Sequence, residues 1–117
     1  MDLLRLTIAY LRIWKLCDLE FYTLSQRDSS RVFDVIPIDE LRLKTDLVVF
    51  RDSLRSDPSW ADHELGDSIN TLFSLLNRKP LSDDDLNLLE VLRAKAQQKA
   101  LKYSGEIKIA IGGGAAF

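Results

Sequence analysis

The stretch DLLRLTIAYLRIWKLCDLEFYTLS, residues 2–25, decides the fold class because it contains neither glycine nor proline. Strand-like alternation occurs within it only in short pieces such as LRLTI. An unbroken segment of this length exceeds the usual length of a strand and favours a helix. We therefore expect the chain to begin with a long helix.

The apolar residues of this first helix cover roughly two-thirds of its circumference, which is wider than the stripe of an ordinary surface helix. The surplus includes the aromatic residues Trp14, Phe21 and Tyr22. A central helix covered by its neighbours has this composition, and so does a helix at a subunit contact. We expect helix 2–25 to be the most buried element, with one flank in the core and the other in an interface.

Charged residues run through the same segment and argue against a membrane span or a secretory leader. They include Arg5, Arg12, Lys15, Asp18 and Glu20. The single cysteine, Cys17, lies among apolar residues and has no partner for an internal disulfide. The sequence thus predicts a cytoplasmic protein, in a cell or in an infected host cell, with no membrane association.

Three further helices are expected downstream, at about 38–56, 58–77 and 83–104. Asp57 and Pro58 form a start signal for the second of these, with Asp as N-cap and Pro at the first helical position. Ser82 is the expected N-cap of the last helix, and Gly105 is its expected end.

Two short segments have the character of strands. RVFDVI, residues 31–36, is rich in β-branched and aromatic residues, and Ile107, Ile109 and Ile111 alternate with other residues in 106–111. Whether the two segments pair as a two-stranded ribbon stays open. An alternating strand near a chain end can also add to the sheet edge of another protein.

The predicted fold is therefore mainly α, a four-helix bundle-like single domain over residues 1–111, followed by a flexible tail at 112–117. The chain of 117 residues is 46% hydrophobic and 29% charged, as in globular proteins. Its formal net charge of -2 provides no global positive field for nucleic acid.

His63-Glu64-Leu65-Gly66-Asp67 resembles the HExxH zinc motif, with aspartate in place of the second histidine. On a helix, positions 63 and 67 share a face, so both side chains would reach one metal ion. No further histidine or cysteine nearby supplies a third ligand, and we predict no metal and no cofactor.

The stretch LGDSINTLFSLLNRKPLSDDDLNLLEVL resembles the helix-turn-helix of phage-repressor type. The resemblance implies a recognition helix at 68–77 lying in the major groove of DNA. Arg78 and Lys79 would then contact the DNA. Phe73 and Leu75 stand where base-reading polar groups are expected.

A basic cluster spans the later turns of the last expected helix and the segment after it. Its alternatives are a contact with an acidic partner or RNA and a solvated helix end, where cations match the helix dipole. Its members are Arg93, Lys95, Lys99, Lys102 and Lys108. No nucleophile or acid–base constellation accompanies these motifs, so we predict no catalytic residues.

The leading prediction is a non-enzymatic protein–protein interaction module, acting as an adaptor, inhibitor or assembly factor, that self-associates as a homodimer or larger oligomer through its first helix. The predicted contact residues are Trp14, Phe21, Tyr22, Ile107, Ile109 and Ile111. The alternative is a DNA-binding regulator that uses residues 58–77.

Overall fold

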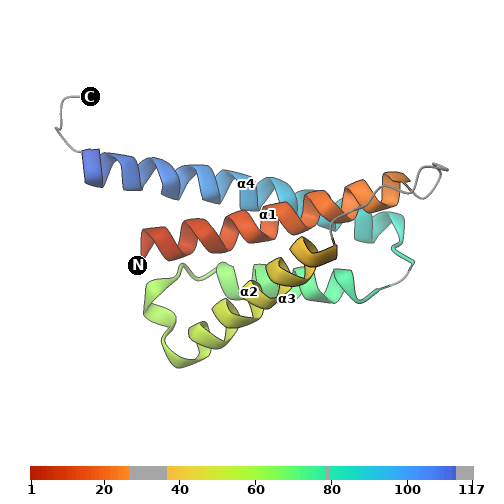
Figure 1. Ribbon diagram of the computed structural model, residues 1–117, viewed down its shortest axis with the longest axis horizontal. Helices are drawn as coiled ribbons and strands as arrows, with labels where there is room; N and C mark the ends of the chain where they lie inside the picture. Colours follow the sequence, from red (N-terminus) through yellow and green to blue (C-terminus); the bar gives the residue numbers. More distant parts are fainter. Residues whose placement is uncertain (27–36, 79, 113–117) are drawn as a thin grey trace.

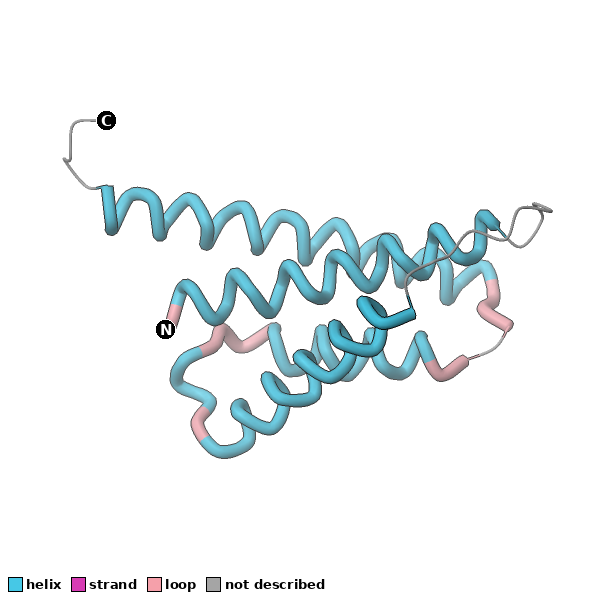
Figure 2. Tube along the Cα trace, viewed as in Figure 1, coloured by secondary structure: helices cyan, strands magenta, loops and turns pink. Residues whose placement is uncertain are grey.

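The computed structural model describes residues 1–26, 37–78 and 80–112. The elements are α1 (Leu3–Gln26), α2 (Pro37–Ser56), the short 3₁₀ helix η1 (Pro58–Trp60), α3 (Leu65–Leu76) and α4 (Asp83–Gly112). Within these ranges the chain contains four α-helices and no strand (Figures 1 and 2). The predicted mainly helical fold is confirmed.

Helix α1 is the central element, because it packs against each of the other three helices. Helix α4 runs antiparallel along one side of α1, and α2 and α3 lie on the other side (Figure 1). Helices α2 and α4 do not contact each other in the described part of the chain. The position of α1 between neighbours explains why its apolar arc is so wide.

The core forms along the side of α1 that faces α3 and α4. Leu6, Tyr10, Ile13 and Cys17 are completely buried there, at helical spacing. Burial raises the pKa of the Cys17 thiol to about 12, so the thiol stays protonated and packs as a small hydrophobe. The other helices complete the core with Leu47, Leu65, Ile69, Leu72, Leu75, Leu89 and Ala96.

The predicted start of a long helix at Asp57 and Pro58 is wrong. Asp57 caps only the 3₁₀ turn, accepting a hydrogen bond from the amide of Ser59 at 3.1 Å, and α3 begins at Leu65. A second aspartate, Asp62, accepts from the amides of Glu64 and Leu65 at 3.2 and 3.0 Å. This cap competes with Asp57 and sets the helix start, because it satisfies amides that have no partner inside the helix.

The predicted cap at Ser82 is confirmed. The amide of Asp85 donates to Ser82 Oγ at 3.1 Å, and the amide of Ser82 donates to Asp85 Oδ2 at 3.1 Å. This reciprocal pair is a capping box with aspartate at its third helical position, and it fixes the start of α4.

The prediction of a strand at 106–111 is wrong, because α4 continues past Gly105 to Gly112. A helix satisfies its backbone hydrogen bonds internally, whereas a strand needs a partner. The other half of the proposed ribbon, 31–36, lies outside the described residues. The predicted domain boundary at 111 falls one residue before the end of α4, and residues 113–117 lie outside the described part.

None of the helices in the described ranges combines the length and apolar character needed to cross a membrane.

Candidate functional site

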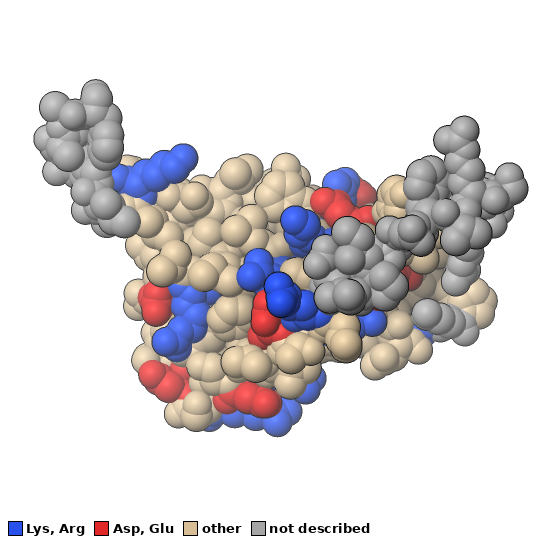
Figure 3. All heavy atoms as spheres, in the orientation of Figure 1, with Lys and Arg blue, Asp and Glu red and all other residues tan. Residues whose placement is uncertain are grey.

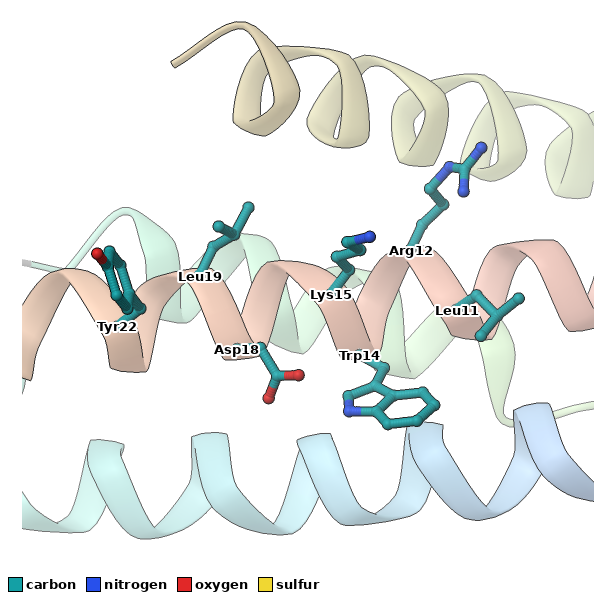
Figure 4. Close-up of a pocket in the computed structure, with 7 residues that line it drawn as sticks. All are labelled: Leu11, Arg12, Trp14, Lys15, Asp18, Leu19 and Tyr22. Atoms are coloured by element: carbon teal, nitrogen blue, oxygen red, sulfur yellow. The ribbon is translucent and has the colours of Figure 1, made fainter. Parts of the chain in front are cut away.

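An open groove runs along the side of α1 that lies between α2 and α4. Its volume is about 590 Å³. Figure 4 shows the side chains that line it, all from α1: Leu11, Arg12, Trp14, Lys15, Asp18, Leu19 and Tyr22. The groove exists because α2 and α4 flank α1 without meeting each other.

Four of these residues form a stripe along the exposed face of α1. Leu11, Lys15, Asp18 and Tyr22 follow each other at intervals of four, three and four residues, which places them on one side of a helix. All four are exposed, and Leu11 and Tyr22 each keep 38% of their surface accessible. We call these four residues the α1 stripe.

Ion pairs neutralise two of the charges in the groove. Arg12 Nε binds Asp46 of α2 at 3.0 Å, and Asp18 Oδ1 binds Arg93 of α4 at 3.4 Å. Lys15 makes no ion pair or hydrogen bond within the described ranges. Among the described residues, the groove therefore combines apolar side chains with one cation, Lys15, that has no counter-ion.

The structure brings Trp14 and Tyr22 to this groove but separates the other predicted contact residues from it. Trp14 is half-buried, with its ring directed toward α4 (Figure 4). Phe21 is half-buried beneath the guanidinium of Arg93, at 5.8 Å from its ring centre. It does not line the groove.

The three predicted isoleucines lie in the last turns of α4, whose C-terminal end extends past the N-terminal end of α1 (Figure 1). Ile107 is half-buried and Ile109 is 74% exposed. Ile111 is helical, and its side chain lies outside the described part. These residues and the α1 groove are at different ends of the molecule.

Residues 58–77, which the DNA-binding alternative uses, form one 3₁₀ turn followed by one α-helix. Residues 58–60 form a 3₁₀ turn in place of a preceding helix, and α3 turns Ser68, Ile69 and Leu72 into the core. Arg78 forms an ion pair with Asp85 at 2.6 Å, and Lys79 lies outside the described residues. Basic and acidic side chains are interspersed over the face seen in Figure 3.

The residues of the zinc-like motif, 63–67, do not converge on one point in the structure. His63 and Asp67 are exposed, and Glu64 binds Lys99 at 2.8 Å. Within the described ranges no three His, Cys, Asp or Glu side chains gather in a way that would hold a metal ion. The cations of the predicted basic cluster are partly engaged, since Lys99 binds Glu64 and Lys102 lies 5.4 Å from the ring centre of Tyr103.

Sequence reasoning missed a buried polar cluster centred on Asp62. The Asp62 side chain is only 7% exposed. Its Oδ1 accepts a hydrogen bond from Tyr10 at 2.7 Å, and its Oδ2 accepts from Tyr103 at 2.6 Å and from Lys99 at 3.1 Å. The cluster joins α1, the start of α3 and α4 through one carboxylate.

The charges in this cluster are fixed near neutral pH. Burial opposes ionisation of Asp62, but the hydrogen bonds from Tyr103, Tyr10 and Lys99 outweigh it and lower the pKa of the carboxyl group. Burial, reinforced by Asp62, raises the pKa of Tyr10. Burial works against the Lys99 cation, yet its bonds to Glu64 and Asp62 raise the pKa of the ammonium group. The hydrogen bonds of Asp62 hold α1, α4 and the segment before α3 together.

A comparison of the chain with protein-family models, with curated proteins and with solved structures finds no match.

Proposed function

We propose that this protein is a non-enzymatic interaction module, an adaptor, inhibitor or assembly factor, that self-associates through the open face of α1. The observation that carries the proposal is the groove between α2 and α4, where the central helix of the fold keeps accessible apolar side chains. Accessible aromatic and aliphatic side chains that alternate with charged ones are typical of non-obligate protein interfaces.

The chemistry of the groove supports a protein partner. Trp14 and Tyr22 provide aromatic surface, and Leu11 and Leu19 add aliphatic surface. Aromatic residues are enriched at the buried centres of interfaces, where they contribute a large contact area for little loss of conformational freedom. Arg12, Lys15 and Asp18 add charged groups, and Lys15 and Asp18 lie between Leu11 and Tyr22 along the helix.

Sedimentation velocity over a range of concentrations tests this proposal. We expect the wild-type protein to shift from monomer to dimer as its concentration rises. Leu11→Glu should weaken the dimer about 10-fold or more, because it places an unpaired charge in a desolvated contact. Val49→Glu is the matched control, since Val49 is 61% exposed on α2 and lies outside the groove.

Trp14→Glu should also abolish the dimer, but Trp14 is half-buried and its loss will disturb folding. Circular dichroism of each variant separates the two effects. A wild-type protein that stays monomeric at millimolar concentration, or a Leu11→Glu variant that dimerises as well as the wild type, contradicts the proposal.

A further inference from the structure

The α1 stripe has a charge pattern that is complementary to itself when reversed. In chain order the exposed side chains are apolar, cationic, anionic and apolar, at Leu11, Lys15, Asp18 and Tyr22. Read from the other end, the order is apolar, anionic, cationic and apolar. A second α1 laid antiparallel therefore presents an opposite charge to each charge and an apolar group to each apolar group.

We infer that the occupant of the α1 groove is a second copy of this chain, docked with its α1 antiparallel about a two-fold axis between Lys15 and Asp18. Lys15 then faces Asp18 of the second copy, and Leu11 faces Tyr22 of the second copy. This inference rests on the proposed function, and it adds the partner, the orientation and the register.

A two-fold arrangement makes each of these contacts twice. In such an interface, if one residue contacts a second, the second also contacts the first across the axis. The spacing suits the arrangement, because side chains three and four residues apart form ridges that fit the grooves of a facing helix. Both Lys15–Asp18 contacts thus form together.

The charges within one copy favour this partner. Lys15 has no ion pair in the described part of the chain. Asp18 binds Arg93 through Oδ1, and its side chain remains 50% exposed. The carboxylate can therefore accept a second cation, and Lys15 of the other copy supplies one.

The same charges disfavour the parallel alternative. An in-register parallel pair would set Lys15 against Lys15 and Asp18 against Asp18. Like charges placed opposite each other across an interface destabilise it and exclude that arrangement. Arg12 does not change this balance, because Asp46 of the same copy neutralises it at 3.0 Å.

Charge-swap variants test the register. Lys15→Glu alone sets a new carboxylate against Asp18 of the other copy, and Asp18→Lys alone sets a new ammonium group against Lys15. Each variant should therefore dimerise about 10-fold more weakly than the wild type or worse. An equimolar mixture of the two variants should recover the wild-type affinity. In the mixed dimer, the two introduced side chains face each other at one contact, and the unchanged Asp18 and Lys15 face each other at the other.

Lys108→Glu is the control for the change of charge, because Lys108 is exposed near the end of α4 and lies outside the groove. Circular dichroism checks that Asp18→Lys, which also loses the bond to Arg93, still folds. Fluorescent labelling of one variant allows the mixed dimer to be measured separately from either homodimer.

The outcomes distinguish the register from the proposed function. If the wild type dimerises and Leu11→Glu disrupts the dimer, but the mixed variants do not recover, the antiparallel register is wrong and the proposed function stands. Single swaps that dimerise like the wild type also overturn the register. A wild type that remains monomeric, with its groove occupied by its own chain or by another protein, overturns both.

Discussion

The two sides of α1 show how one helix serves two purposes. On the side facing α3 and α4, Tyr10 and Ile13 are completely buried, and Tyr10 is hydrogen-bonded to Asp62. On the side between α2 and α4, Leu11, Lys15 and Asp18 are exposed. The buried side fixes the fold by filling space and by a shared carboxylate, whereas the exposed Leu11 and Lys15 of the open side should contribute little to the stability of one copy.

This contrast separates stability from function. A residue on the buried side should change the free energy of unfolding when substituted, and a residue on the open side should change association. Substitutions on the two sides of α1 test that separation.

The largest change in the free energy of unfolding is expected for Ile13→Ala. Ile13 has no accessible surface, so truncation loses the buried methyl groups and leaves a cavity. We expect a loss of about 2–5 kcal/mol in the free energy of unfolding, measured by urea denaturation. A loss under about 1 kcal/mol would show that this side of α1 is not the core.

Asp62→Asn should have the next largest effect, a loss of about 2–4 kcal/mol, because it leaves Lys99 and two tyrosine hydroxyls without their charged acceptor. The matched control is Asp67→Asn, which changes an exposed residue in the first turn of α3 and should change stability little.

The loss of stability caused by Asp62→Asn should depend on pH. The pKa of Asp62 is lowered from its ordinary value of 3.8, so the unfolded chain binds a proton more readily than the folded one. The contribution of Asp62 is therefore complete above that value and is lost as the pH falls through it toward the folded pKa. The stability difference between wild type and Asp62→Asn should shrink below about pH 4, in denaturation series at successive pH values. A difference that stays constant into acid would contradict the role of the ionised carboxylate.

A smaller effect is expected for Tyr103→Phe, which removes one hydroxyl donor at 2.6 Å from Asp62 and keeps the ring stacked on Tyr10. We expect a loss of about 1–2 kcal/mol. In a double-mutant cycle with Asp62→Asn the two losses should not add, because both variants remove the same hydrogen bond. Additive losses would mean that the hydroxyl and the carboxylate act independently.

The smallest change in the free energy of unfolding is expected for Leu4→Ala, at the N-terminal end of the open side of α1. Leu4 is 62% exposed, so its truncation should change the free energy of unfolding by no more than about 0.5 kcal/mol. Thermal denaturation of dilute protein measures this. A loss comparable to that of Ile13→Ala would break the distinction between the two sides.

The sequence predicted helices well where local signals agreed with the packing. Residues 2–25 lack any helix breaker, and Ser82 has a reciprocal partner three residues later, so both elements appear where expected. It failed where two local signals competed. Asp57 and Asp62 are both suitable caps, and Asp62 in addition accepts hydrogen bonds from Tyr10 and Tyr103, which are 52 and 41 residues away in the chain.

The candidate site was predictable in part. The aromatic surplus of the first helix pointed to Trp14 and Tyr22, which do line the groove, and also to Phe21, which packs beneath Arg93. A helical wheel gives the width of an apolar arc but not which part of it the neighbours cover. Lys15 and Asp18 were seen only as charges that exclude a membrane span.

The sequence by itself determined that the chain is helical and where α1, α2 and α4 begin, since these depend on breakers, caps and periodicity over a few residues. Only the tertiary structure decided that α2 and α4 flank α1 without meeting, that Asp62 joins three elements, and that residues 106–111 continue a helix. Those outcomes depend on contacts between segments that are distant in the chain. Local sequence patterns do not report the free energies of such contacts.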